Sequence, residues 1–249
     1  MKKEERKRLI MREINLHNRV LSADLSTSLN VSDDTILRDL KELSDEGKIL
    51  KIHGGAASLS FVAPFNIQNV VYALEAKKSM AKKALKLLRN NMIVLTEGGT
   101  SILELAKMIP QNLRTTIFTI SPQVAITLSQ HENLTVITIG GNLFKNANLH
   151  VGSGTINQLA DIKADLCLLG ANAFSVDGGL SDLDWEVVQA KKALIRSAKR
   201  VAVLAISEKL NTNQTIKICD LDNIDYLITE LDPNDDFFTP YRNTRLKII

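Results

Sequence analysis

The sequence predicts an α/β protein with two domains: a small N-terminal domain of short helices and a β-hairpin, then a larger doubly wound, mostly parallel α/β domain. The first observation is a change of pattern along the 249 residues, because apolar residues at helical spacing give way to short apolar runs that alternate with helices. The second is a composition of 45% hydrophobic and 24% charged residues, which is typical of a globular protein. Aromatic residues make up only 4%, which argues against stacking platforms for single-stranded nucleic acid.

Residues 1–57 are predicted to contain three short helices. A first helix of about residues 3–17 has apolar residues at helical spacing. Ser22 is expected to cap a second helix, and Ser32 a third one that follows a turn. The third helix carries one apolar stripe at positions i, i+4 and i+7, namely Ile36, Leu40 and Leu43.

A β-hairpin follows the third helix. Gly47 is expected to end the helix as its C′ residue, and residues 48–52 then form a short strand. His53, Gly54 and Gly55 make the turn into a second strand. Three small helices followed by a hairpin predict a winged helix-turn-helix over residues 1–57, with the hairpin as the wing.

Residues 58–74, which include Pro64, show little periodicity and are predicted to be a linker. Residues 75–249 form the second domain, in which Ser121 caps a helix that has Pro122 at its first position. The predicted strands are residues 92–95, 115–120, 134–139, 166–169, 201–205 and 226–229. Helices between them, at 100–109 and about 184–198, imply a parallel, doubly wound sheet.

The third helix also has a charged face. At 100° per residue, Asp34, Arg38, Lys41 and Asp45 point away from the apolar stripe, with Leu37 at the edge of that face. A recognition helix inserts such a face into the major groove, where Arg or Lys reaches guanine edges or phosphates. A solvated charged face would show the same pattern, and residues 1–57 hold eleven basic against ten acidic side chains, so charge alone does not decide.

The order of the sequence motifs decides between a DNA-binding face and a solvated charged face. The run from Leu29 to Leu43 and the run from Gly47 to Ala56 resemble the DeoR family of bacterial transcriptional regulators, whose pattern is V-S-x-x-T-I-R-R-D-L and then G-x-L-x-R-x-H-G-G-A. Leu37 stands where the family has its first arginine, and Lys51 replaces the wing arginine. A leucine can contact a thymine methyl group but cannot bind guanine as arginine does. The resemblance implies binding of operator DNA by Ser32, Asp34, Thr35, Leu37, Arg38, Lys41, Lys51 and His53.

The resemblance continues along the chain and implies a sugar-phosphate-sensing domain with the fold of ribose-5-phosphate isomerases and CoA transferases. Its landmarks occur in order, from the loop at residues 96–100 to Ser207 and Lys209. The loop also suits an anion, since glycines expose backbone N–H groups at a helix N-terminus, although an ordinary tight turn looks the same. The effector-binding residues implied are Thr96, Glu97, Gly98, Gly99, Thr100, Thr119, Ser121, Gly141 and Lys209.

Departures from the family gather at this expected site. The family's L-D-S-G-T-T loop reads L-T-E-G-G-T here, Ile120 and Ile206 replace polar residues, and Gln68 replaces an arginine. Glu97 adds a negative charge that would repel a dianion, or would fill the site as an internal substitute paired with Lys209. We therefore expect weak binding of ordinary hexose and pentose phosphates; the alternative is that Glu97 points to solvent.

No catalytic site, metal site or cofactor is expected. The four histidines lack metal-ligand spacing. Asp182, Asp184 and Glu186 could serve in acid/base chemistry, but acidic residues also favour a solvated helix N-terminus. Cys167 and Cys219 lie in apolar runs and are expected to be buried, inert thiols.

The charged N-terminus and the absence of a long apolar run predict a cytoplasmic protein without a membrane segment. The sequence as a whole predicts a homo-oligomeric transcriptional regulator, a dimer or tetramer. It would be a repressor of a carbohydrate-metabolism operon that binds double-stranded operator DNA and responds to a small phosphorylated metabolite. Two alternatives remain open: a sugar-phosphate isomerase or transferase with an accessory DNA-binding domain, and an assembly module whose sensor site is inactive.

Overall fold

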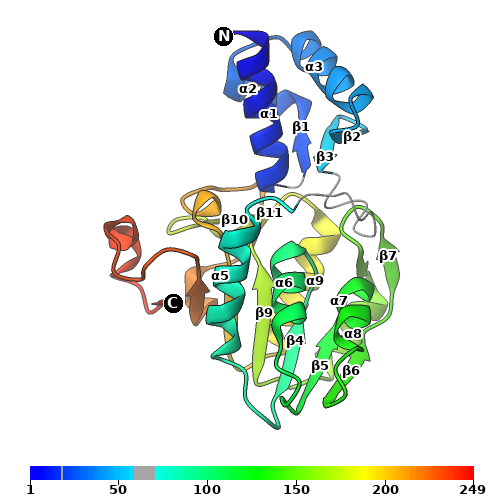
Figure 1. The fold of residues 1–249 in the computed structure, drawn as a ribbon, viewed down its shortest axis with the longest axis vertical. Helices are drawn as coiled ribbons and strands as arrows, with labels where there is room; N and C mark the ends of the chain where they lie inside the picture. The colour runs from blue at the N-terminus through cyan, green and yellow to red at the C-terminus, as the bar shows by residue number, and fades with distance from the viewer. Residues whose placement is uncertain (18, 59–70) are drawn as a thin grey trace. The chain divides into compact units, whose positions relative to one another are not determined.

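The computed structural model describes residues 1–17, 19–58 and 71–249. The chain divides into two compact units, Met1–Tyr72 and Ala73–Ile249 (Figure 1). Most of the predicted linker, with Pro64 and Gln68, lies outside the described residues.

The first unit has the predicted helices and hairpin. Its helices are α1 (Lys3–His17), α2 (Ser22–Leu29) and α3 (Asp33–Asp45). Its antiparallel sheet has the order β1-β3-β2, made of Arg19–Leu21, Gly55–Ser58 and Ile49–Ile52. Strand β1 was not predicted, because three residues are too few to show an alternating pattern; it pairs Val20 with Ala56.

Local sequence explains where α3 begins and ends. The Ser32 hydroxyl accepts a hydrogen bond from the Thr35 backbone N–H at 3.4 Å, which confirms the predicted N-cap. Gly47 follows the helix with φ +68°, a conformation that only glycine adopts at little cost. The prediction that Ser22 caps α2 is wrong: Ser22 is the first residue of the helix, and its hydroxyl donates to the Gly54 carbonyl at 3.2 Å.

Ion pairs hold α1 against α3. Arg6 makes two hydrogen bonds to Asp39, at 2.5 and 3.2 Å, and the Asp39 side chain is only 1% exposed. Lys7 Nζ lies 2.8 Å from a carboxylate oxygen of both Glu42 and Glu46. Because α1 is fixed in this way on one side of α3, the opposite side of α3 stays open to solvent.

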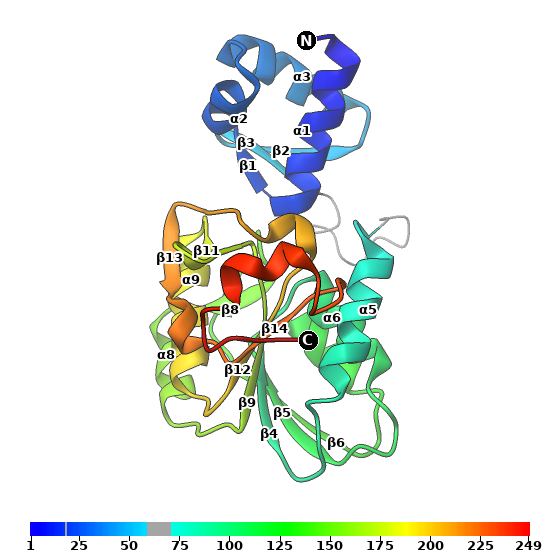
Figure 2. The same ribbon diagram turned by 90° about the vertical axis from the view of Figure 1, so that its left-hand side faces the viewer.

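The second unit is built on a seven-stranded, wholly parallel sheet in the order β15-β14-β12-β9-β4-β5-β6. The strands are, in the same order, Lys247–Ile248, Tyr226–Ile228, Val201–Leu204, Leu166–Gly170, Ile93–Thr96, Thr115–Thr119 and Leu134–Thr138. Helices α5 (Leu74–Leu85), α6 (Thr100–Met108) and α7 (Pro122–Leu128) cover one face. Helices α8 (Ser153–Ala160) and α9 (Trp185–Arg196) cover the other, as Figure 2 shows, which confirms the predicted doubly wound sheet.

Several short elements were not predicted. Strands β10 (Ala173–Ser175), β11 (Gly179–Asp182) and β13 (Ile216–Cys219) form a small antiparallel sheet. Strands β7 (Asn142–Phe144) and β8 (Leu149–Val151) form a hairpin. Three short 3₁₀-helices complete the unit: η1 (Ser207–Lys209), η2 (Leu221–Asn223) and η3 (Asp236–Tyr241).

The two cysteines differ in burial. Cys167 on β9 is fully buried, as predicted, but Cys219 at the end of β13 is partly exposed, so that part of the prediction is wrong. Burial still raises the pKa of Cys219 to about 11, which keeps its thiol protonated at neutral pH. Among the described residues, no helix combines the length and apolarity that crossing a membrane requires.

The Arg6–Asp39 pair yields a stability prediction. Asp39→Ala should destabilise the first unit by roughly 1.5–3 kcal/mol, because it removes charged hydrogen bonds and leaves the half-buried guanidinium without its partner. Hydrogen-exchange mass spectrometry of the full chain, read on peptides within residues 3–45, measures the loss.

Lys3→Ala is the matched control. Lys3 pairs with Glu42 in solvent, with half of its side chain exposed, so its loss should cost no more than about 1 kcal/mol. Equal protection of α1 and α3 in wild type and Asp39→Ala would show that the pair does not hold the two helices together.

Candidate functional site

The outer face of α3 carries the first candidate site. Asp34, Leu37, Arg38 and Lys41 are all exposed, opposite the buried Ile36, Leu40 and Leu43, as the helical spacing predicts. Leu37 is 39% exposed, so its side chain can reach a partner. Within the described part of the chain, neither Arg38 nor Lys41 is used in an ion pair, so both side chains are available to a partner.

The wing adds two basic groups to the same unit. Lys51 on β2 and His53 in the turn between β2 and β3 are exposed. Ser32 and Thr35 lie at the start of α3, and their hydroxyls are 2.9 Å apart. The eight residues implied in DNA binding thus fall on two places, the outer face and first turn of α3 and the wing.

The second candidate site lies where the parallel strands of the large sheet end. The loop after β4 holds Glu97, Gly98 and Gly99, and α6 begins at Thr100 with no side chain capping its N-terminus. This loop touches the next one, because a Cβ added to Gly98 would lie 2.9 Å from the Ser121 hydroxyl. Unsatisfied backbone N–H groups at such a helix start favour a negative charge.

Three predicted effector residues stabilise the loops at this edge: Thr119 and Ser121 through hydrogen bonds of their hydroxyls, and Gly141 through close packing. Thr119 donates to the Glu97 carbonyl at 3.4 Å and accepts from the Ser121 N–H at 3.1 Å. Ser121 caps α7 by accepting from the Val124 N–H, as predicted. Gly141 lies against Thr155 of α8, since a Cβ there would lie 2.0 Å from the Thr155 hydroxyl.

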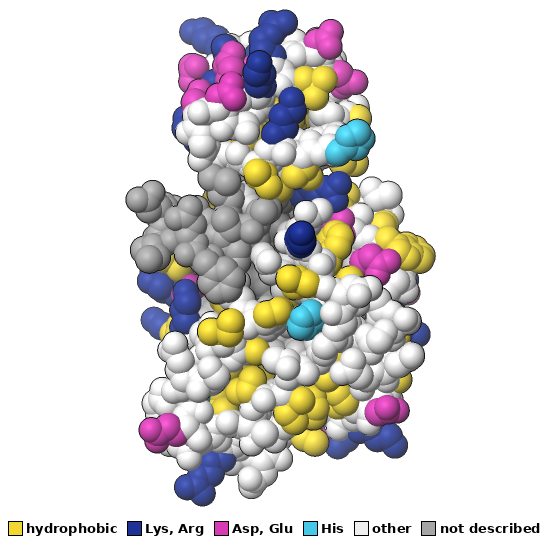
Figure 3. All heavy atoms as spheres, turned by 90° about the vertical axis from the view of Figure 1, so that its right-hand side faces the viewer, with side chains coloured by type: hydrophobic (Ala, Val, Ile, Leu, Met, Phe, Trp, Pro, Cys, Tyr) yellow, Lys and Arg dark blue, Asp and Glu magenta, His cyan; other side chains and the backbone are white. Residues whose placement is uncertain are grey.

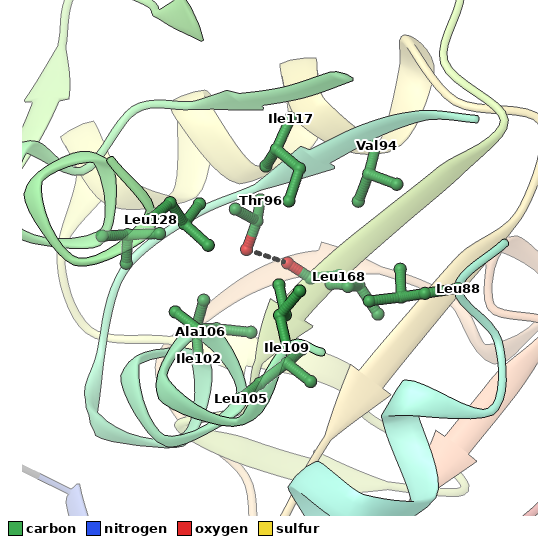
Figure 4. A pocket seen from close by; sticks show the side chains of 11 residues that line it. Leu88, Val94, Thr96, Ile102, Leu105, Ala106, Ile109, Ile117, Leu128 and Leu168 are labelled. Carbon is green, nitrogen blue, oxygen red and sulfur yellow. Dashed lines mark hydrogen bonds between the residues drawn. The ribbon is translucent and has the colours of Figure 1, made fainter. Parts of the chain in front are cut away.

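Thr96 lies elsewhere. Its hydroxyl donates to the Leu168 carbonyl at 3.1 Å and faces an apolar pocket between the sheet and α6 (Figure 4). The other lining side chains come from aliphatic residues such as Val94, Ile117 and Leu128. Apart from the Thr96 hydroxyl, which already donates to Leu168, the lining is apolar, so this pocket does not suit a phosphorylated ligand.

Glu97 is buried, with 3% of its surface exposed. One carboxylate oxygen accepts the Gly170 N–H at 2.5 Å, and the other lies 3.4 Å from Lys191 Nζ. Both expectations for this residue are therefore wrong: it does not point to solvent, and its partner is Lys191 on α9, not Lys209. Burial, offset in part by Lys191, raises the pKa of Glu97 to about 7.

Lys191 connects Glu97 to a second buried carboxylate. It donates to Asp182 at 3.0 Å and to the Gly170 carbonyl at 3.1 Å. Asp182 also accepts from the Asn172 side chain and from the Leu183 N–H. The expectation of a solvated helix N-terminus is therefore wrong for Asp182, although Glu186 is exposed; Asp182 lies on β11 and is held by a lysine.

Lys209 is the remaining predicted effector residue, and it is 9% exposed. Its Nζ donates to the Ala171 carbonyl at 2.8 Å, and no carboxylate in the described residues lies within ion-pair distance of it. Burial, together with the positive charges of Lys77 and Lys191, lowers the pKa of Lys209 to about 7. A buried cation that lacks a counter-ion suits an anionic ligand.

Sequence reasoning missed Lys77, Glu104 and Lys191. All three are buried charged residues on helices. Lys77 shares the buried face of α5 with Met80, Ala81 and Ala84, and Lys191 shares that of α9 with Val187, Val188 and Leu194. A charged residue inside an apolar helical stripe was the signal that could have identified them.

Comparison with known proteins adds the family. The profile of the DeoR C terminal sensor domain matches residues 73–231, and that of the DeoR-like helix-turn-helix domain matches residues 6–61. HTH-type transcriptional regulator GolR of Listeria innocua is 30% identical over 98% of this chain and 97% of that protein. The glycerol-3-phosphate regulon repressor of Escherichia coli is 27% identical over 94% and 93%, and the repressor GlcR of Bacillus subtilis is 30% identical over 95% and 92%.

Solved structures are more distant. Ribose 5-phosphate isomerase A of Methanocaldococcus jannaschii is 18% identical, with a TM-score of 0.39 over 54% of this chain and 53% of that one. The eIF2B beta subunit of Chaetomium thermophilum is 16% identical, with a TM-score of 0.47 over 67% and 52%. Scores of this size carry no argument about activity or ligand.

The two profile matches fall on the two units of the structure, one on the helix-turn-helix and one on the parallel sheet. Together with the 30% identity to GolR over nearly the whole chain, they show that this protein belongs to the DeoR family of transcriptional regulators.

Proposed function

We propose that this protein represses an operon of carbohydrate metabolism, that it binds operator DNA through its first unit, and that it binds a small phosphorylated metabolite at the edge of its large sheet. The observation that carries the proposal is the outer face of α3, where Arg38 and Lys41 are exposed on a helix fixed by its cap and by α1. Relatives named as repressors of a glycerol-3-phosphate regulon support the class of regulated genes.

The geometry supports a division of labour between α3 and the wing. In the major groove, Arg38 can bind the O6 and N7 atoms of guanine, and Leu37 can contact a thymine methyl group. Lys51 and His53 suit phosphate oxygens, which fix orientation without reading sequence. Leucine in place of the family's arginine implies an operator with a thymine at that position.

Ligand binding at the effector site would regulate the affinity for operator DNA. A ligand anion near Lys209 would provide the counter-charge that this lysine lacks, and the uncapped start of α6 adds backbone N–H groups. Binding changes operator affinity if the ligand prefers one conformation of the protein. An assembly module without a working sensor would show no such ligand effect on DNA binding.

An enzymatic role is the second candidate, because a buried carboxylate and lysine lie together in the Asp182–Lys191 pair. The pair is poorly suited to proton transfer. Lys191 lowers the pKa of Asp182, and Glu97 and Asp182 together raise the pKa of Lys191, so Asp182 and Lys191 each hold their charge at neutral pH. Turnover of ribose 5-phosphate to its ketose would favour the enzyme, and its absence together with operator binding would favour the regulator.

The edge strand β6 is suited to pairing with a second copy of the chain. The strand is unpaired on one side in the described sheet, and its sequence, Leu134–Thr138, holds no charge or proline that would block pairing. Ile126, Ile137 and Leu143 are exposed on α7, β6 and β7, and Figure 3 shows hydrophobic side chains at the surface on that side of the unit. A second copy of the chain is the proposed occupant, since two half-sites need two recognition helices.

The DNA proposal predicts that Arg38→Ala weakens operator binding by roughly 1–3 kcal/mol and relaxes specificity at one base pair, whereas Lys41→Ala weakens binding to all sequences alike if Lys41 contacts phosphate. Fluorescence anisotropy with fragments of the DNA upstream of the neighbouring genes measures both effects.

Glu132→Ala, on the second unit, is the control and should bind like wild type. If the Arg38 and Lys41 double variant shifts the same fragments as tightly as wild type, α3 is not the reading helix.

The oligomer proposal predicts a dimer or tetramer at micromolar concentration in sedimentation experiments. Ile137→Lys places a charge on the β6 edge and should shift the protein toward monomer, with weaker operator binding as a consequence. Ile93→Lys is the control, because Ile93 is exposed to the same degree on a central strand. A wild-type monomer, with and without DNA, would contradict self-association; an Ile137→Lys dimer would move the interface elsewhere.

A further inference from the structure

Glu97 lies in the loop that leads into α6, close enough to Lys209 to influence its pKa, and this inference rests on the proposed function. The Glu97 carboxylate already accepts the Gly170 N–H at 2.5 Å and lies 3.4 Å from the Lys191 ammonium. A backbone N–H and an ammonium group are the donors that a phosphate or carboxylate ligand uses. The chain thus provides its own anion at the start of the loop that leads into α6.

Opposing effects act on the pKa of Glu97. Lys191 on α9 favours the charged form, whereas Asp182 on β11 and complete burial disfavour it. The Cys167 thiol on β9 stays neutral, because burial and the nearby charge of Glu97 raise its pKa. From η1, Lys209 is close enough for Glu97 and Asp182 to raise its pKa, against the lowering by burial.

We propose that Glu97 determines the ligand specificity of this site: its carboxylate competes with the anionic group of the effector, so an anion binds together with a proton. A dianion brought beside Glu97 would gather four negative charges around the paired Lys191: two from the dianion and one each from Glu97 and Asp182. Protonation removes the Glu97 charge and so removes its repulsion of an anion bound near Lys209 and the start of α6. Neutral polyols and singly charged ligands pay a smaller penalty than dianions.

The sign of the pH dependence follows. In the free protein the pKa of Glu97 is about 7, and a bound anion raises it. Below pH 7 Glu97 is already neutral, so anion affinity is flat there. Above pH 7 each bound anion requires proton uptake, and affinity falls by up to about tenfold per pH unit. Lys209 acts in the same direction, since its pKa is also about 7 and a bound anion raises it.

Calorimetric titration of the full chain with sulfate tests the proposal, because sulfate does not titrate between about pH 6 and 8. Two buffers of different ionisation enthalpy report the protons taken up. Wild type should bind sulfate at least about tenfold more weakly at pH 8 than at pH 6, with net proton uptake at pH 8. Glycerol 3-phosphate, run in parallel, should show the same trend.

Glu97→Gln should bind sulfate roughly tenfold more tightly than wild type at pH 8, with a shallower pH dependence that Lys209 alone supplies. Glu97→Ser is the second variant, in case the glutamine amide beside Lys191 disturbs folding; circular dichroism confirms the fold of each. Glu186→Gln is the matched control, since Glu186 is exposed on the first turn of α9, and it should behave like wild type.

Sulfate affinities of both folded Glu97 variants that equal those of wild type at pH 6 and at pH 8 would overturn the role of Glu97 and leave the proposed effector site standing. If no folded form binds either anion at any pH, the effector site itself fails, and the role of Glu97 with it. Operator binding by α3 is measured separately and is untouched by either result.

Discussion

The effector side of this molecule depends on one constraint, the need of buried charges for partners. Lys191 satisfies two carboxylates at once, Asp182 at 3.0 Å and Glu97 at 3.4 Å. Its ammonium therefore connects α9 to β11 and to the loop after β4. Lys209 lies on η1, after β12, and among the described residues its ammonium group donates only to the Ala171 backbone carbonyl. The charge of Lys191 is thus neutralised by two carboxylates, whereas Lys209 has no carboxylate partner in the described part of the chain. An anionic ligand therefore contributes most near Lys209.

The DNA-binding unit depends on ion pairs between α1 and α3. Arg6 and Lys7 of α1 pair with Asp39, Glu42 and Glu46 on α3 and beside it. These pairs consume the acidic residues on one side of α3 and leave Arg38 and Lys41 on the other. The outer face carries Asp34 and Asp45 beside Arg38 and Lys41, so it offers DNA two basic side chains that are unpaired within the described residues and is not a uniformly basic face.

The sequence predicted the elements whose periodicity or capping is strong. The stripe of α3, its Ser32 cap and the Pro122 start of α7 are confirmed within a residue or two. Strands such as β1, β10 and β11 escaped prediction because they are short and also lack the continuous apolar run that marks the equally short β14 and β4. The placement of Glu97 could not be predicted either: its partner Lys191 is 94 positions away in the chain, and only the packing of α9 on the sheet brings them together.

The central claim is that Glu97 is an internal anion which titrates near neutral pH. Carbon-13 NMR of the glutamate carboxyl groups tests it most directly, with the Glu97 signal assigned by its absence from Glu97→Gln. The account predicts a pKa of about 7 for Glu97 in the free protein, which rises further when sulfate is added. A pKa near the ordinary 4.5 for glutamate, unchanged by sulfate, would contradict it.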